Sequence, residues 1–123
     1  TTENLKWKNK EDVIIKKIDT LIDEFGVPDF CKIDTEGFEL EILSNLSYQI
    51  PVIEFEFNEA FIDETLSCLD SINNLGSYKF NFILNENPKF INKKWNAMTE
   101  IKKQISNLPT KHLHGNLFAK LNQ

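Results

Sequence analysis

The sequence predicts an α/β fold in which a mostly parallel sheet carries helices on both faces. Short apolar or alternating segments, typical of strands, occur in turn with segments that have the apolar spacing of helices. Such alternation is typical of crossover connections between parallel strands. The length of 123 residues and the apolar fraction of 41% suit one domain with a hydrophobic core. We therefore expect a single domain over residues 1–123.

Two strands and a short helix are expected first. Residues 12–17 contain three consecutive β-branched residues and favour a strand, although the apolar residues up to Phe25 also fall at helical spacing. We prefer a strand at 12–17, followed by a helix that Asp19 caps and that ends at Phe25. Gly26 suits the left-handed position just past a helix end. The short apolar segment 30–33 predicts the second strand.

The middle of the chain predicts two further helix–strand pairs. Apolar residues recur at helical spacing over residues 38–46 and again over residues 62–72. Residues 52–57 alternate between apolar and acidic side chains, and residues 78–84 alternate between apolar and polar ones. We expect helices in the first two segments and strands in the other two.

The last part of the chain predicts a loop, a helix and a strand. Residues 85–94 are polar and favour an exposed loop, whereas apolar spacing over residues 95–108 predicts a helix that Pro109 closes. Residues 115–120 predict a final strand. Since only a loop and one helix separate the last two strands, we expect them to pair antiparallel at one edge of the sheet.

The charge balance argues against a protein that binds duplex nucleic acid. The net charge is −5, and the chain has fourteen lysines and no arginine. A duplex binder would present a basic face, with arginines for base edges. An acidic chain can still carry a local basic patch, for which Lys89, Lys93 and Lys94 are candidates. A solvated, charged loop is the simpler interpretation of these three lysines.

Cysteine usage and hydropathy favour a cytoplasmic protein. Cys31 and Cys68 are the only cysteines, and they lack the spacing of a metal or redox motif. Two such thiols are typical of reduced, half-buried residues in an intracellular protein. No apolar run approaches the roughly 18 residues of a membrane span, and no signal peptide is present. We therefore expect no membrane partner.

The run from Phe30 to Glu39 is the first candidate site. It predicts a strand that ends in an acidic turn and opens a helix, and ligands of open α/β sheets bind beyond such strand ends. Asp34 and Glu36 are placed to orient a hydroxyl or to bind a metal that does so. Capping of the following helix by Asp34 or Thr35 is an equally natural role and is compatible with the first. Gly37 permits an unusual backbone angle in the turn.

Charged residues inside predicted strands form a second set of candidates. Lys32 and Glu54 lie within strands, as does Glu56, and buried charges are normally paired. If the two strands are neighbours, Lys32 should pair with Glu54 or Glu56. Glu56 and Asn58 stand at the carboxyl end of their strand and are candidates for substrate contact.

Two histidines raise the question of a metal. His112 and His114 would share a face of an extended segment, yet no third ligand is evident nearby. Exposed loop histidines are therefore the preferred interpretation, and no metal site is predicted.

Five stretches in order resemble a known family. They are Ile18–Asp23, Lys32–Glu39 with Leu43 after it, Pro51–Glu56, Leu75–Tyr78 and Asn116–Ala119. Together they resemble the C-terminal half of an FkbM-type methyltransferase, a class I enzyme with a Rossmann-like sheet that uses S-adenosylmethionine. The resemblance implies O-methylation of a hydroxyl on a sugar, glycan or polyketide-like acceptor.

The sequence departs from the family in its glycines. A class I methyltransferase holds its cofactor with a glycine-rich turn, whereas the four glycines here are far apart and form no Gly-x-Gly. The resemblance therefore implies that residues 1–123 are the C-terminal portion of the domain, with its N-terminal half absent. S-adenosylmethionine would be bound mainly by residues outside this chain, and no cofactor-binding residue is assigned within it. The isolated chain is expected to be inactive.

Site roles follow from the same resemblance. Asp34 matches the acidic residue that ends the fourth strand near the methyl donor, so Asp34 and Glu36 would orient or deprotonate the acceptor. A non-catalytic module that binds a partner or associates with itself is the main alternative, because the strand 30–33 would have an exposed edge. A metal-dependent hydrolase using Asp34, Glu36 and Glu56 ranks lowest.

Overall fold

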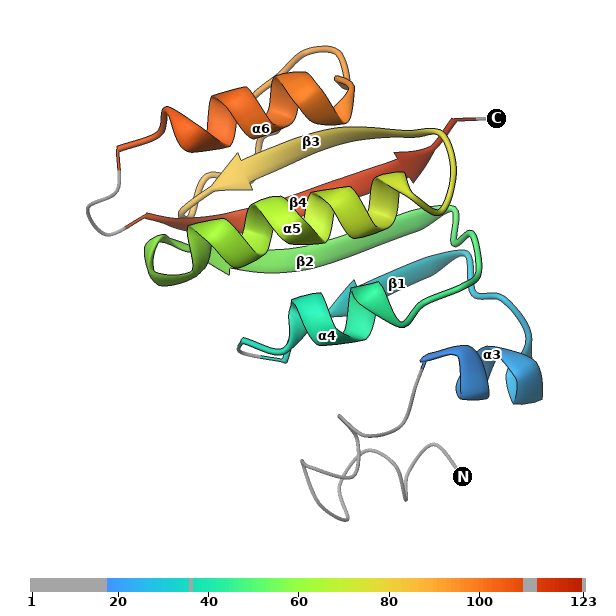
Figure 1. Cartoon of the computed structure of the whole chain (residues 1–123). Helices are drawn as coiled ribbons and strands as arrows, with labels where there is room; N and C mark the ends of the chain where they lie inside the picture. The colour runs from blue at the N-terminus through green and yellow to red at the C-terminus, as the bar shows by residue number, and fades with distance from the viewer. Residues whose placement is uncertain (1–17, 36, 110–112, 123) are drawn as a thin grey trace.

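The computed structural model describes residues 18–35, 37–109 and 113–122, which form helices packed on a four-stranded sheet (Figure 1). The predicted strand at 12–17 lies outside these residues. The elements in chain order are α3 (Ile18–Phe25), β1 (Phe30–Ile33), α4 (Glu39–Ser44), β2 (Val52–Asn58), the 3-10 turn η1 (Glu59–Phe61), α5 (Ile62–Asn73), β3 (Tyr78–Leu84), α6 (Met98–Ser106) and β4 (His114–Leu121).

The sheet is mixed, with the strand order β1-β2-β4-β3. β1 and β2 pair parallel, whereas β4 pairs antiparallel with both β2 and β3. The expectation of a mostly parallel sheet is therefore wrong for two of the three pairings, although β1, β2 and β3 point in the same direction (Figure 1).

The antiparallel strand β4 lies inside the sheet, and its pairing with the outer strand β3 makes one edge of the sheet antiparallel, as expected. β4 can lie between β2 and β3 because its buried side is small and aliphatic, formed by Gly115, Leu117 and Ala119. Gly115 is required for this close approach, since a Cβ there would lie 2.3 Å from the carbonyl oxygen of Ile83. The pairing of the last two strands is antiparallel, as expected.

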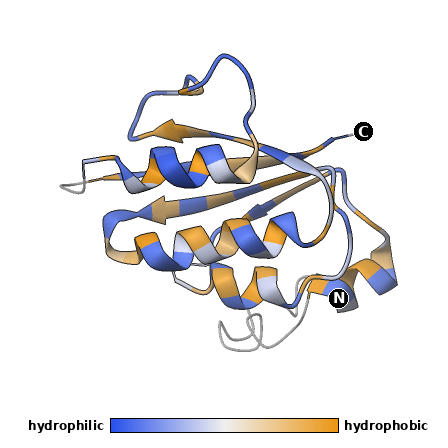
Figure 2. Cartoon of the chain, turned by 45° about the horizontal axis from the view of Figure 1, so that its top comes forward, coloured by the Kyte–Doolittle hydropathy of each residue, from blue (hydrophilic) through white to orange (hydrophobic). Residues whose placement is uncertain are grey.

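Helices α4, α5 and α6 cover one face of the sheet (Figure 1). The core lies between this face and the helices, with fully buried side chains such as Ile53, Phe55, Leu69, Phe82 and Ile105. Figure 2 shows apolar residues recurring among hydrophilic ones along these helices, as amphipathic helices require.

No described helix lies on the opposite face, so the expectation of helices on both faces is wrong for this part of the chain. The reason is chemical: the central strands direct Glu54, Glu56 and Asn116 to that face, and these side chains do not form an apolar surface for a helix.

The segment between β3 and α6 covers part of the polar face. Asn96 exchanges two backbone hydrogen bonds with Phe80, which extends the chain along the outer edge of β3. The helix consequently begins at Met98, three residues later than expected, and Trp95 belongs to the loop. Phe90 packs against Trp95 and against Phe118 of β4, with both ring-centroid distances at 5.1 Å.

Several local expectations are confirmed. Gly26 has φ of +91° and its N–H donates to the carbonyl of Ile22, which ends α3 as expected. Both cysteines are free thiols, with Cys31 half-buried and Cys68 buried. Within the described residues, no helix is long and apolar enough to span a membrane.

Candidate functional site

The turn after β1 is built around the carboxylate of Glu39. Its Oε2 accepts the backbone N–H of Thr35 at 3.1 Å, and its Oε1 accepts the N–H of Gly37 at 3.0 Å. Gly37 adopts φ of +109°, which confirms the unusual backbone angle expected there. The N-cap residue of α4 is Phe38, which provides no side-chain cap, so capping by Asp34 or Thr35 is wrong. Glu39, the first residue of the helix, accepts the amides of the turn instead.

Asp34 is thereby left exposed at the carboxyl end of β1. The Thr35 hydroxyl beside it is buried and has no hydrogen-bond partner among the described residues. Glu36 lies outside the described residues, so its expected position is not tested.

A cavity of about 160 Å³ opens at the carboxyl end of β2, between α4 and α5. The turn after β1 contributes Gly37 and Glu39, and the end of β2 contributes Glu56 and Asn58. The other lining residues come from α4, β2, η1 and α5: Leu40, Phe55, Phe57, Phe61, Glu64, Thr65 and Cys68. Two of the four predicted site residues therefore line one cavity, whereas Asp34 does not line it.

The cavity wall is acidic. Glu39 of α4 and Glu64 of α5 line it, together with Glu56 of β2, whose side chain projects toward the opposite face of the sheet. Burial, together with smaller effects of the negative charges of Glu39 and Glu64, raises the pKa of the Cys68 thiol from 9.0 to about 12. Cys68 is therefore a neutral thiol rather than a nucleophile.

Sequence reasoning missed Glu39 and Glu64 as parts of this site. Glu39 stood in the motif but looked like an ordinary first-turn residue of a helix. Glu64 stands in the first turn of α5, and acidic residues there usually offset the helix dipole. Only the approach of α4 to α5 brings the two carboxylates to one cavity.

A comparison with models of protein families shows the family of this chain. The model of the methyltransferase FkbM domain matches residues 2–107. The chain belongs to the FkbM methyltransferase family. The match includes the whole turn after β1 and every residue that lines the cavity, whereas β4 lies beyond it. No curated protein matches the chain.

Asn58 has a structural role in this FkbM domain as well as a place in the cavity wall. Its Oδ1 accepts the N–H of Ala60 at 2.9 Å and caps η1, the turn that carries the chain from β2 into α5. Its side chain is thereby held in a fixed orientation at the rim.

The expected pairing of Lys32 is confirmed with Glu54. The two residues are opposite each other in the β1–β2 register, and Lys32 Nζ lies 4.0 Å from Glu54 Oε2. Asn116 of β4 donates to the same oxygen at 2.9 Å. This cluster joins three neighbouring strands on the polar face of the sheet, away from the cavity, and its role in the FkbM domain is to satisfy a nearly buried carboxylate.

Of the two histidines, only His114 lies within the described residues. His114 Nε2 lies 3.9 Å from a carboxylate oxygen of the exposed Glu86, and His112 is outside the described residues. In the described part of the FkbM domain, no three His, Cys, Asp or Glu side chains form a group that could hold a metal ion.

Proposed function

We propose that this chain is the acceptor side of an S-adenosylmethionine-dependent O-methyltransferase. The acceptor would be a hydroxyl of a sugar, glycan or polyketide-like molecule. The observation that carries the proposal is the acidic cavity, because it lies beyond the carboxyl ends of β1 and β2 within the residues that match the FkbM family. Fold-level analogy alone would not assign a function.

The carboxylates would align an acceptor hydroxyl and accept its proton. Methyl transfer to oxygen requires a hydroxyl that is aligned and that loses its proton. Glu56 and Asn58, at the carboxyl end of β2, would bind and orient neighbouring hydroxyls of the acceptor. Asp34 and Glu36, in the turn beside it, would orient the reacting hydroxyl and accept its proton.

The described residues do not fit a whole S-adenosylmethionine. Ligand sites of drug size occupy roughly 300–1,000 Å³, whereas this cavity has about 160 Å³. The chain also has no Gly-x-Gly turn to hold the cofactor. The cofactor, which supplies the methyl group, would therefore be bound mainly by residues outside this chain. The class I, Rossmann-like arrangement of the complete domain is part of the same proposal.

A methyl-transfer assay on the natural protein that contains this chain tests the assigned roles. Labelled S-adenosylmethionine is offered with a panel of hydroxyl acceptors. We expect Asp34→Asn to lower kcat about 100-fold, the usual loss of a general base. The matched control is Asp29→Asn, because Asp29 is also exposed but precedes the amino end of β1. Equal activity of both variants would remove Asp34 from the mechanism.

A second pair of variants tests whether the acceptor binds at the cavity. We expect Glu56→Gln to raise the KM of the acceptor about tenfold, the value of one hydrogen bond to a charged group. Glu59→Gln is the control, since Glu59 is exposed near the same strand end but does not line the cavity. An unchanged KM in the Glu56 variant would place the acceptor elsewhere.

Calorimetry with the 123-residue chain tests where the cofactor binds. We expect weak or no heat of binding for S-adenosylmethionine, and restored binding in the natural protein if that protein supplies a glycine-rich turn. Tight binding to the 123-residue chain would contradict the proposed location of the cofactor contacts.

Self-association through β1 is a second candidate function. β1 is an outer strand of the sheet and pairs only with β2 among the described residues. Phe30 at its start is 50% exposed. An unpaired edge next to an exposed aromatic residue is a template for a strand of another chain.

Sedimentation velocity over a range of concentrations tests this candidate. If β1 associates, the chain should form a concentration-dependent dimer that Phe30→Lys weakens. Phe25→Lys is the matched control, because Phe25 is also an exposed phenylalanine, at 60%, but lies on α3. A monomer at every concentration, or equal effects of both variants, would refute association through this edge.

We also propose a cytoplasmic location, supported by the two free thiols. Cell fractionation with detection of the natural protein tests it, and recovery in an oxidising compartment would contradict it.

A further inference from the structure

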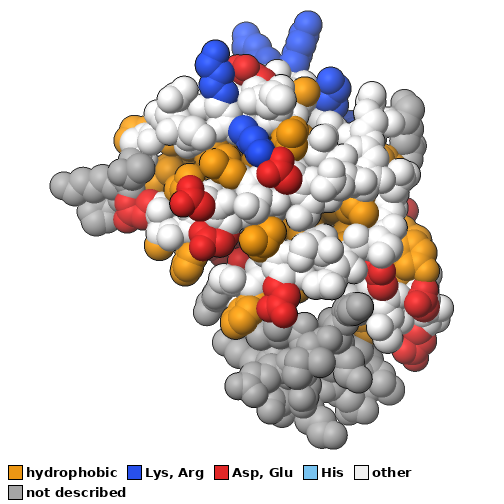
Figure 3. Space-filling model, in the orientation of Figure 1, with side chains coloured by type: hydrophobic (Ala, Val, Ile, Leu, Met, Phe, Trp, Pro, Cys, Tyr) orange, Lys and Arg blue, Asp and Glu red, His pale blue; other side chains and the backbone are white. Residues whose placement is uncertain are grey.

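Charge is unevenly distributed along this chain. Residues 18–76 contain a single lysine and fourteen Asp and Glu residues, whereas residues 77–122 contain eight lysines and two glutamates. Figure 3 shows the result on the helix-covered face of the molecule, with basic side chains gathered at the top, over α6, and acidic ones mostly below them, over α3, α4 and α5. An anionic ligand would therefore be attracted to the second part of the chain.

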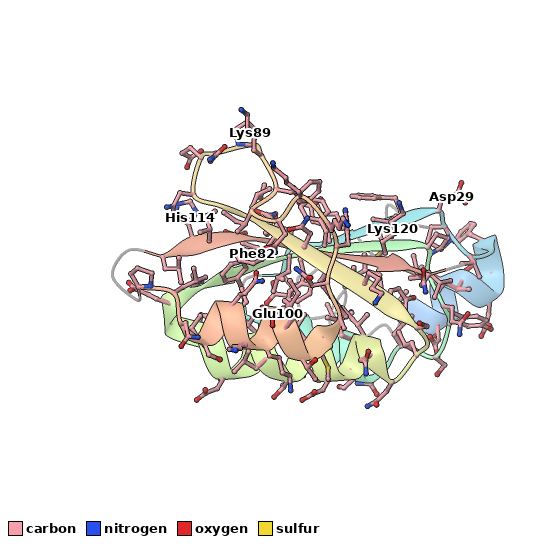
Figure 4. The ribbon with its side chains drawn as sticks, turned by 90° about the horizontal axis from the view of Figure 1, so that it is seen from above. Asp29, Phe82, Lys89, Glu100, His114 and Lys120 are labelled. Carbon is pink, nitrogen blue, oxygen red and sulfur yellow. The ribbon has the colours of Figure 1, made fainter. Side chains whose placement is uncertain are left out.

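A hollow of about 400 Å³ lies in this basic part. Its lining residues are Lys79, Trp95, Lys120, Leu121 and Asn122. It is at the opposite end of the sheet from the acidic cavity, because Lys120 is paired with the first residue of β2, whereas Asn58 at the cavity is paired with His114. Figure 4 shows Lys120 and His114 toward opposite ends of the sheet.

Two lysines of the hollow lie opposite each other in neighbouring strands. Lys79 and Lys120 are directly opposite in the antiparallel β3–β4 register, so their side chains project from the same face. Like charges in this position destabilise a sheet. Neither lysine forms an ion pair with any carboxylate in the described ranges. A bound anion would offset this cost.

A fixed aromatic ring stands beside the lysines. The indole of Trp95 packs against Phe90, and Phe90 packs edge-on against Phe118. Lys120 Nζ lies 5.9 Å from the centroid of the indole. The two backbone hydrogen bonds of Asn96 hold the loop immediately after Trp95. A ring held in this way can stack on a ligand at little cost in conformational entropy.

We propose that this hollow binds a small anionic ligand that contains a ring. A phosphate or carboxylate group would lie between the ammonium groups of Lys79 and Lys120, and the ring would stack on Trp95. The amide of Asn122 would bind a polar substituent of the ring. A phosphorylated sugar and a nucleoside monophosphate share this chemistry. The proposal does not depend on the proposed methyltransferase function, because none of these residues lines the acidic cavity.

Titration of the full chain with four probes tests the proposal. The probes are inorganic phosphate, glucose, glucose 6-phosphate and adenosine 5′-monophosphate. Binding is followed by calorimetry and by the fluorescence of Trp95 in a Trp7→Phe background, since the chain has two tryptophans. We expect at least one phosphorylated ring compound to bind about tenfold more tightly than inorganic phosphate, and glucose to bind least. Tighter binding of the nucleotide identifies a stacked base, and tighter binding of the sugar phosphate identifies a stacked sugar.

Variants separate this site from general attraction to lysines. Lys79→Ala and Lys120→Ala should each weaken the phosphorylated probes about tenfold, the value of a hydrogen bond to a charged group. The control is Lys103→Ala, an identical charge change at an exposed position of α6. Trp95→Leu, with an unchanged circular dichroism spectrum, should remove the preference over inorganic phosphate.

Three results would overturn the proposal. They are the absence of binding by both phosphorylated rings at 10 mM, equal losses in the Lys79, Lys120 and Lys103 variants, and equal affinity of glucose and glucose 6-phosphate. The lysine variants remove a repulsion rather than a packed group, so they should fold even if the Trp95 variant does not.

Discussion

Replacing Glu39 by alanine should destabilise the turn that carries the candidate catalytic residues. The Glu39 carboxylate accepts two backbone amides, those of Thr35 and Gly37, at 3.1 and 3.0 Å. Hydrogen bonds to a charged group are worth about 1.5–3 kcal/mol each when they are buried. Gly37 is exposed and Thr35 only half-buried, so each bond is closer to a helix cap at about 1 kcal/mol. The expected loss is therefore about 2 kcal/mol.

Urea unfolding and amide exchange measure this loss. With the urea dependence expected for a domain of this size, the midpoint should fall by about 1 M. The amides of Thr35 and Gly37 should exchange faster with solvent in the variant. Glu39→Gln, which keeps an acceptor oxygen without the charge, should lose about half as much free energy.

The control is Glu41→Ala, an exposed position on the same helix with the same change in helix propensity. Equal midpoints for the Glu39 and Glu41 variants, with unchanged exchange of the two amides, would refute the role of Glu39 in the turn.

Two further predictions concern stability. Gly115→Ala should destabilise the fold by about 3 kcal/mol, since its Cβ would lie 2.3 Å from the backbone oxygen of Ile83. Gly76→Ala, where the Cβ meets only the flexible end of Gln49, should cost far less, and similar urea midpoints would contradict this packing argument. Because burial raises the pKa of Cys68 from 9.0 to about 12, its contribution to stability is complete below pH 9 and is lost as the pH rises toward 12. Between pH 8 and pH 10, the free energy of unfolding should therefore fall by about 1 kcal/mol more in the natural chain than in Cys68→Ala. An equal fall in both proteins would refute the raised pKa of Cys68.

Local features of this protein could be predicted from the sequence because they depend on neighbouring residues. Short apolar or alternating segments identified the described strands, and helical spacing identified the described helices. Gly26 and Gly37 identified two turns with positive φ. The predicted start of a helix was less accurate where a contact with a distant segment determines it. The expected helix began at Trp95, but Asn96 pairs with Phe80 of β3, so α6 begins only at Met98. A pairing of Lys32 with Glu54 or Glu56 could be predicted from the two strands, and their register decided for Glu54.

The arrangement of the elements was decided by tertiary contacts. β4 lies between β2 and β3 because small residues on its buried side allow the close approach, and no local pattern specifies that position. Both candidate sites depend on such contacts. Glu39 and Glu64 reach one cavity only when α4 packs against α5, and Lys79 meets Lys120 only through the β3–β4 register. Local periodicity thus determined which segments are helices and strands, whereas packing between distant segments determined which charges meet.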